Sequence, residues 1–568
     1  MTRSLVDKPW RRPGTAAYAR RRIGALRKPP VTVYEMASDV RKDADVPVLL
    51  RDGVTLRLNL FRPAGATEPL PVLLSAHPYG KDAVPRRRGR HWALNPQFRI
   101  MNQTAPLRIS DQTSWEAPDP VWWAQQGYAV INLDVRGGGH SEGRGDLFSD
   151  QEANDIAQVI AWAAEQPWSN GRVGMLGVSY LAISQYKVAA LNPPALKAIC
   201  PWEGFTDIYR DFCTSGGVVE DGFARIWFFL SAKAARLNTN LGAERRRHPL
   251  RDEWWDALAP DLSKITVPIL ECTSFSDANL HSGGSMRAFQ RVASEHRHAY
   301  AHRGPKWAVF YSAEARAHQR AFFDRHLAER DAPELPPLRL EVRDRGDRVV
   351  EVRDEHEWPL ARTQWRRLHL TADGALTECR PTTPSGTPSG TVSFDLRRAA
   401  LAFEHRFDED TELSGPMTLR LRLSTERARD PRLFVGIEKR ANDMPVPFQG
   451  SYGYGRDRIA QGRLRVSLRG LDPELSTPHQ PVHAFRTLQP VRPGEQVDVT
   501  IALSPSATLF HAGESLRLMI AGRYLEPRNP LFGHFPTHYV RSSRGTATIV
   551  CGEASALEIP AIPAHPAP

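Results

Sequence analysis

Short apolar runs alternate with amphipathic stretches along roughly the first 335 residues of the chain. Runs typical of buried strands occupy residues 71–76, 128–133 and 172–176. Apolar side chains recur at helical spacing in residues 150–165 and 180–191. Strands that alternate with helices predict βαβ units, and therefore a mostly parallel sheet.

A different pattern begins after about residue 335. Apolar and polar residues now alternate one by one, as in residues 419–423, 464–469, 497–501 and 516–518. Glycines and prolines separate these short segments. Period-two strands between such turns indicate an all-β sandwich or jelly roll.

An insertion interrupts the first pattern at residues 203–262, where aromatic, helix-compatible sequence replaces the alternation. We interpret it as a helical cap over the sheet, between two parts of one α/β core. An Arg- and Pro-rich segment precedes the core. The predicted organisation is a basic arm at 1–35, the core at 36–202 and 263–335, the cap at 203–262 and the β-sandwich at 336–568.

Composition and charge narrow the functional classes. Of the 568 residues, 41% are hydrophobic and 24% charged, which excludes a disordered or collagen-like chain. The net charge of +11 invites a nucleic-acid interpretation. However, the basic residues concentrate in residues 1–30 and 86–90, and no nucleic-acid-binding motif accompanies them. We therefore interpret the charge as a solvated surface and expect no nucleic-acid partner.

The cysteines and the apolar runs indicate a reducing, non-membrane setting. The five cysteines, Cys200, Cys213, Cys272, Cys379 and Cys551, are far apart and form no CxxC pair. The basic N-terminus lacks the apolar run of a secretory signal, and no stretch of about 18 apolar residues could span a bilayer. We expect a cytoplasmic protein without a membrane partner.

The segment 172–180 carries the strongest chemical signal, because it predicts a strand, then Gly177-Val178-Ser179, then a helix. A nucleophilic serine on such a sharp turn needs a small residue two positions earlier. The turn also places the Tyr180 N–H at the helix N-terminus, where it can stabilise an oxyanion. Leu181 and Ala182 follow, so the usual Gly-x-Ser-x-Gly pattern is incomplete. An ordinary helix N-cap serine is the alternative.

These residues resemble the nucleophile motif Gly-x-Ser-Tyr-x-Gly of the cocaine esterase-like (CocE/NonD) hydrolases, which group with the X-prolyl dipeptidyl peptidases and α-amino acid ester hydrolases. Four further segments resemble this family in the same order, at residues 134–143, 166–171, 322–324 and 462–467. The departure is Ala182, where the family usually has Gly. The resemblance implies an α/β-hydrolase core with an inserted helical cap, followed by a C-terminal jelly roll.

A serine nucleophile needs a histidine base and an acid that orients it, in the chain order Ser, acid, His in α/β-hydrolases. Asp277 follows the apolar run 267–272 and resembles the family's acid. We expect His302 to be the base, because it resembles the family's histidine, which follows a strand and precedes a Gly-containing turn, with His298 as second choice. His281 is too close to Asp277 for the usual separate loop.

The family resemblance also implies a tyrosine hydroxyl as an oxyanion donor, and Tyr79 after the run 71–74 matches it. Trp202, Phe205 and Trp227 are weak candidates for an acyl pocket, since such rings also build the cores of caps. The carboxylates that α-amino acid ester hydrolases place just after the acid are replaced here by Asn279 and Leu280.

The sequence therefore predicts a serine hydrolase that cleaves small carboxylic esters or amides through an acyl-enzyme. No cofactor and no metal are expected, because no clustered His/Cys ligand set occurs. An X-Pro dipeptidyl peptidase is one alternative, although no anchor for a substrate amine is recognisable. A catalytically silent binding protein that uses its jelly roll is another. A homo-oligomer is compatible with the sequence.

Overall fold

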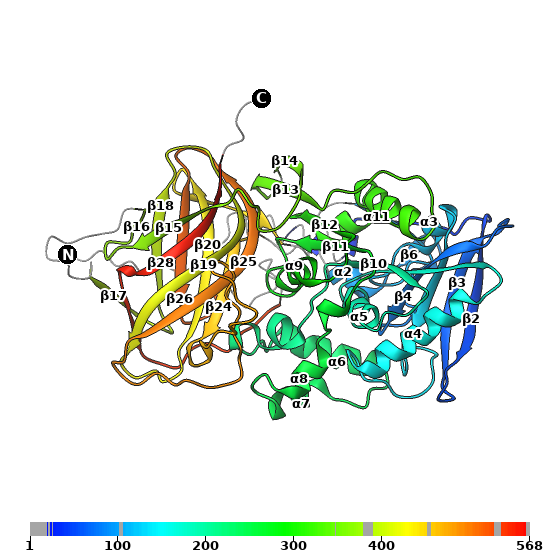
Figure 1. Cartoon of the computed structure of the whole chain (residues 1–568), viewed down its shortest axis with the longest axis horizontal. Coiled ribbons are helices and arrows are strands. Elements are labelled where there is room, and N and C mark those ends of the chain that lie inside the picture. The colour runs from blue at the N-terminus through cyan, green and yellow to red at the C-terminus, as the bar shows by residue number, and fades with distance from the viewer. Residues whose placement is uncertain are drawn as a thin grey trace.

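The computed structural model of the chain describes residues 27–100, 106–346, 348–378, 390–450, 456–526 and 536–563, together with residues 20, 23 and 24. Most of the expected basic arm at 1–35, and Cys379, lie outside these residues. Figure 1 shows the N-terminal sheet and its helices at one end of the molecule and the C-terminal strands at the other.

One long mixed sheet organises the N-terminal half. Its central strands run parallel, and antiparallel strands close both edges. In spatial order the strands are β2 (Val40–Leu49), β3 (Thr55–Pro63), β8 (Ala129–Asp134), β4 (Leu70–His77), β9 (Ser169–Val178), β10 (Leu196–Trp202), β11 (Ile269–Ser274), β12 (Arg297–His302), β13 (Leu338–Arg345) and β14 (Arg348–Glu355).

Helices cover both faces of this sheet, which is why its central strands are apolar without alternation. Every residue of β4 and β8 is buried. Helix α4 (Asp150–Ala164) begins at Ser149, whose side chain accepts a hydrogen bond from the Glu152 N–H, and buries its apolar stripe against the sheet. The other flanking helices are α3 (Pro120–Gln125), α5 (Tyr180–Ala189), α9 (Ser282–Arg291), α10 (Lys306–Phe310) and α11 (Ala313–His326).

A set of short helices separates β10 from β11, where an insertion was expected. It contains a π-helical turn (Ile208–Cys213) and three α-helices, α6 (Phe223–Ala234), α7 (Leu241–Arg247) and α8 (Glu253–Leu258). Figure 1 shows α6, α7 and α8 along one side of the sheet. Smaller elements complete this half: β1 (Val31–Tyr34), β5 (Arg86–Arg88), β6 (His91–Ala93), α2 (Pro96–Ile100) and β7 (Leu107–Ser110).

The C-terminal half is an antiparallel β-sandwich. Its longest strand, β19, pairs with β25, β27 and β28, while β26 pairs with β18 and β20. The strands are β15 (Gln364–Leu370), β16 (Leu376–Thr377), β17 (Thr391–Asp395), β18 (Ala400–Arg406), β19 (Thr411–Thr425), β20 (Arg432–Ala441), β21 (Met444–Val446), β22 (Phe448–Gln449), β23 (Arg456–Asp457), β24 (Ala460–Arg465), β25 (Val497–Phe510), β26 (Ser515–Ala521), β27 (Thr546–Val550) and β28 (Gly552–Ile562).

The expected fold class, an α/β-hydrolase core with a helical cap and a C-terminal all-β domain, is confirmed. A β-bridge between Arg343 of β13 and Thr508 of β25 joins the two halves. Among the described residues, every helix is too short or too polar to cross a bilayer.

Candidate active site

Ser179 occupies the sharp turn between β9 and α5. Its φ of 57° and ψ of −114° are strained for a residue with a side chain, and strain of this kind is typical of functional positions. The Ser179 N–H donates to the Trp202 carbonyl over 3.0 Å, which ties the turn to the neighbouring strand β10. An added Cβ at Gly177 would lie 2.4 Å from the Leu181 Cβ, so the turn requires a glycine there.

Ala182, the departure from the family pattern, fits because a glycine faces it. A Cβ added at Gly204 would lie 3.0 Å from the Ala182 Cβ. The methyl group of Ala182 therefore occupies space that a side chain at position 204 would otherwise take. Ala182 is fully buried and leaves the backbone turn at Ser179 in the strained geometry described above.

Asp277 and His281 meet Ser179 from the loop between β11 and α9. The Ser179 Oγ lies 3.2 Å from the His281 Nε2, and the His281 Nδ1 lies 2.5 Å from the Asp277 Oδ2. One turn of backbone joins the acid and the histidine, because the His281 N–H donates to the Asp277 carbonyl over 3.1 Å. Both side chains are buried. The three groups form a continuous relay from hydroxyl to carboxylate.

His302, the histidine expected beside Ser179, contacts Glu203 instead. Its Nε2 lies 3.2 Å from the Glu203 Oε1, and its Nδ1 accepts a hydrogen bond from the Gly304 N–H over 3.1 Å. The Gly304 N–H therefore occupies Nδ1, and Nε2 is the ring nitrogen that faces Glu203. The expectation that His302 lies beside Ser179 is therefore wrong, and His281 lies there instead. The histidine does not need a loop of its own, because one backbone turn from Asp277 to His281 brings the two side chains together.

Lys306 is a member of this cluster that sequence reasoning missed. Its Nζ lies 2.9 Å from both the Asp277 Oδ2 and the His281 Nδ1, and 3.5 Å from the Glu203 Oε2. Burial and the Lys306 cation lower the pKa of His281, although Asp277 opposes them. Burial alone would raise the pKa of Asp277, but Lys306 and His281 outweigh it and lower that pKa. His281 is thus held neutral, and able to accept a proton, beside an ionised Asp277.

The two expected oxyanion donors both line the cavity at Ser179. The Tyr79 hydroxyl accepts a hydrogen bond from the Trp227 Nε1 over 3.0 Å. The Tyr180 N–H donates to the Glu116 Oε2 over 3.2 Å. Glu116, like Lys306, carries no sequence pattern that would single it out, although it lines the cavity.

The cavity is small, about 70 Å³, and its wall is mostly aromatic. Phe205 and Trp227 line it, as expected, and the Phe205 ring stacks on the His281 ring with centroids 6.0 Å apart. Trp202 is buried behind the site, where its ring packs against Tyr300 and stacks on His302. A volume of this size holds about two water molecules, or a short acyl group.

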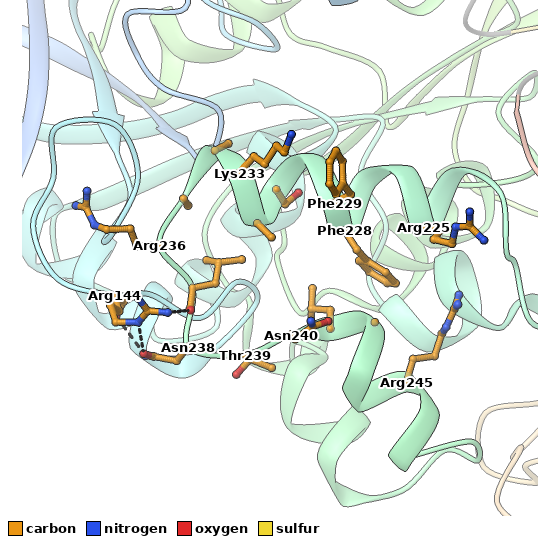
Figure 2. A pocket seen from close by; sticks show the side chains of 18 of the residues that line it. Arg144, Arg225, Phe228, Phe229, Lys233, Arg236, Asn238, Thr239, Asn240 and Arg245 are labelled. Carbon is orange, nitrogen blue, oxygen red and sulfur yellow. Dashed lines mark hydrogen bonds between the residues drawn. The ribbon is translucent and has the colours of Figure 1, made fainter.

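A larger groove of about 1040 Å³ lies on the other side of α6. Figure 2 shows Arg225, Phe228, Phe229 and Lys233 on this helix at the groove. The Arg144 side chain is held by Asn238, as the dashed lines in Figure 2 mark. Neither Ser179 nor His281 lines this groove, so the chemistry of the relay is confined to the small cavity.

Two clusters among the described residues have metal-ligand chemistry, Glu203–Cys272–His302 and Asp45–Asp82–His140. A lysine already neutralises the acids in each of them. Lys306 lies 3.5 Å from Glu203, and the Lys81 Nζ lies 2.6 Å from Asp45 and 2.5 Å from Asp82. We therefore assign no metal to either cluster.

Comparison with known proteins places this geometry in context. The family description "X-Pro dipeptidyl-peptidase (S15 family)" matches residues 52–246, and "X-Pro dipeptidyl-peptidase C-terminal non-catalytic domain" matches residues 331–557. A CocE/NonD family hydrolase from Staphylococcus aureus is 34% identical, with a TM-score of 0.84, over 92% of this chain and 94% of its own.

Two curated relatives are also similar. The cocaine esterase of Rhodococcus sp. (strain MB1 Bresler) is 29% identical over 63% of this chain, and the match spans 66% of that esterase. A putative serine esterase of Mycobacterium bovis is 32% identical over 32% of this chain and 27% of its own length. The chain thus spans less than two thirds of the length of these curated relatives.

Proposed function

Because the chain belongs to the CocE/NonD family of serine hydrolases, we propose that it hydrolyses small carboxylic esters through an acyl-enzyme on Ser179. The observation that carries this assignment is the relay in the small cavity, with 3.2 Å from the Ser179 Oγ to the His281 Nε2 and 2.5 Å from the His281 Nδ1 to Asp277. Nucleophile, base and orienting acid are thus within the distances that acyl transfer requires.

In the acylation step, the Ser179 Oγ attacks the acyl carbon while the His281 Nε2 takes the hydroxyl proton. Asp277 accepts the Nδ1–H of His281 and stabilises the imidazolium that forms. The tetrahedral intermediate collapses, and His281 gives its proton to the departing alkoxide. Water then attacks the acyl-Ser179 with His281 again as base, which releases the acid and restores the serine.

The oxyanion of each tetrahedral intermediate would lie between the Tyr180 N–H and the Tyr79 hydroxyl. Both groups line the cavity beside Ser179. A positioned donor of this kind is typically worth about 3 kcal/mol in the transition state. Trp227 positions the Tyr79 hydroxyl, because its Nε1–H donates to the hydroxyl oxygen and leaves the hydroxyl proton for another acceptor.

The substrate class we propose is an ester with a short acyl group. The cavity of about 70 Å³ has an aromatic wall, which favours a small apolar acyl chain over a long one. The sequence left a dipeptidyl peptidase open as an alternative. The description of the family model that matches residues 52–246, an X-Pro dipeptidyl-peptidase, supports that alternative. A cytoplasmic location and a homo-oligomeric state remain predictions.

Labelling and substrate competition test this function. A fluorophosphonate probe should modify Ser179, and the protein should hydrolyse p-nitrophenyl acetate faster than p-nitrophenyl octanoate. Absence of labelling at Ser179 would reject the acyl-enzyme. Cleavage of Gly-Pro-p-nitroanilide without cleavage of either ester would favour the peptidase. A Ser179→Ala variant provides the control for adventitious ester hydrolysis.

A matched pair of variants tests the histidine assignment. His281→Ala should lower kcat/KM by at least ~1,000-fold, because the base of the relay is lost. His302→Ala should retain most of the activity of its folded fraction, because His302 contacts Glu203 rather than Ser179. The measurement is p-nitrophenyl acetate turnover normalised to active sites. If His302→Ala lost activity and His281→Ala retained it, His302 would be the base instead.

A further inference from the structure

A buried carboxyl group accepts the backbone N–H that the proposed mechanism assigns to the substrate's acyl oxygen. Glu116 lies between β7 and α3, lines the cavity with Ser179 and is 5% exposed. Its Oε2 accepts the Tyr180 N–H over 3.2 Å, and Ser179 lines the same cavity. The carboxyl therefore contacts the oxyanion donor and shares the cavity with the nucleophile.

The protein backbone holds Glu116 in this position. Its φ of 68° is left-handed, a costly conformation for a residue with a side chain. The Val178 N–H, next to the nucleophile, donates to the Glu116 carbonyl over 3.0 Å. On the other side, the Tyr311 hydroxyl donates to the Ala117 carbonyl over 2.7 Å. Strain that is fixed from two sides next to a nucleophile indicates a functional placement.

The groups that face Glu116 decide its charge. Lys306 and Tyr311 approach from α10 and its C-terminal end, His281 from the β11–α9 loop, and Tyr79 from the loop after β4. Burial raises the pKa of Glu116 to about 8, although Lys306, the hydrogen bond from the Tyr180 N–H and the nearby Ser179 side chain oppose the shift. At neutral pH the carboxyl group thus carries a proton, which makes it a hydrogen-bond donor.

We propose that Glu116 is a further catalytic residue, whose protonated carboxyl donates a hydrogen bond to the oxyanion together with the Tyr180 N–H. This role rests on the proposed acyl transfer at Ser179. When the acyl oxygen binds, it replaces the Glu116 Oε2 as acceptor of the Tyr180 N–H, and the carboxyl turns its own O–H toward that oxygen. The proton stays on Glu116 throughout, so no additional acid or base is consumed.

An ionised Glu116 would have the opposite effect. It offers no donor, it competes for the Tyr180 N–H, and its charge repels the developing oxyanion. Activity should therefore be present while Glu116 is protonated and should fall as the pH rises through its pKa. His281 sets the acidic limb of the same profile, because it must be neutral to accept the Ser179 proton.

The test is kcat/KM for p-nitrophenyl acetate from pH 6 to 10 in the wild type, Glu116→Gln and Glu116→Ala. The amide of Glu116→Gln donates but cannot ionise, so this variant should keep activity within about tenfold and lose the alkaline decline. Glu116→Ala should lose about 100-fold or more at pH 7. Thermal melting of each variant shows whether it is folded, and the rate of fluorophosphonate labelling gives a second readout.

Glu271→Gln is the matched control, since Glu271 is another buried carboxyl with a raised pKa, but it accepts the Tyr186 hydroxyl and does not line the cavity. Its alkaline limb should equal that of the wild type. Full activity in Glu116→Ala, or an unchanged alkaline decline in Glu116→Gln, would overturn the role of Glu116 alone. Loss of Ser179 labelling in the wild type would instead reject the acyl-enzyme itself, so the two failures are distinguishable.

Discussion

Lys306 places a full positive charge in contact with both the acid and the base of the relay. The ammonium competes with the His281 Nδ1–H for Asp277, since its Nζ is 2.9 Å from the Asp277 Oδ2. It also opposes protonation of His281, because a second cation so close is unfavourable. Lys306 thus acts as a positioning residue that keeps the base neutral without touching the substrate.

Replacement of this lysine should move the pH profile. Burial and Lys306 lower the pKa of His281, so Lys306→Met should raise that pKa and shift the acidic limb of kcat/KM to higher pH. Turnover at pH 6 should fall several-fold, and turnover near pH 8 should change less. Lys439→Met is the control, because Lys439 is also a buried lysine but pairs with Glu514 in the β-sandwich, away from the relay. An acidic limb at the wild-type pH would contradict this role of Lys306.

The sequence shows only part of the site, and the reason is physical. Ser179 and Asp277 each follow a strand, so their positions are set by local patterns. Which of His281 and His302 lies beside Ser179 depends on the conformation of the loop after β11. The pattern of apolar and polar residues does not predict that conformation. Glu116 and Lys306 carry no motif at all. Their importance comes from burial and from contacts with residues far away in the chain.

The turn between β9 and α5 determines how accurately the nucleophile is placed. Strand and helix approach so closely there that Gly177 has no room for a side chain, whereas Ala182 is accommodated opposite Gly204. The sixth position of the family motif, Ala182, therefore tolerates a methyl group, and the first, Gly177, does not. This difference cannot be read from the motif alone.

A single methyl group at Gly177 should test this constraint. Gly177→Ala forces a Cβ to within 2.4 Å of the Leu181 Cβ, which should lower the free energy of unfolding by about 1–3 kcal/mol and reduce activity by displacing Ser179. Gly65→Ala is the matched control, because nothing lies within 4 Å of the added Cβ. Urea denaturation and active-site titration measure both effects. Equal stability of the two variants would argue against a tight turn.

Most elements could be predicted because each satisfies one local rule. The apolar runs 71–76 and 128–133 become β4 and β8, and the Asp52-Gly53 pair connects β2 to β3 with Gly53 at a φ of 85°. Residues 464–469 show the limit of the rule: β24 ends at Arg465 and residues 466–468 form a 3-10 turn, although the alternation continues. The alternating pattern alone therefore does not locate the end of this strand.

At the scale of the whole molecule, the β-sandwich takes part in holding the relay. Arg463 of β24 donates to the Asn279 Oδ1 over 2.8 Å and to the Ser215 Oγ over 2.8 Å. Asn279 lies in the loop between Asp277 and His281. Arg303, buried directly after His302, donates to the carbonyls of Arg458 and Ile459 over 2.5 and 3.1 Å. The C-terminal half therefore helps to hold the loop that carries Asp277 and His281.

Removal of the Arg463 contacts should affect catalysis from outside the core. Arg463→Met should lower kcat roughly tenfold with little change in KM, because small misplacements of catalytic groups are costly. Arg422→Met is the control, since its pair with Asp498 is exposed. Steady-state kinetics on p-nitrophenyl acetate separates the two constants. A wild-type kcat in Arg463→Met would show that the loop keeps its geometry without the sandwich.

The placement of acid and base on residues 277–281 has a consequence for protein engineering. In hydrolases whose acid and histidine lie on separate loops, both must be grafted in register for a working triad. Here a single five-residue segment, together with Lys306, would carry the orienting acid, the base and the charge that tunes the base. A scaffold that already offers a strained serine turn would receive the acid and the base together from this one segment, while Lys306 and the Arg463 contact to the loop would be added separately.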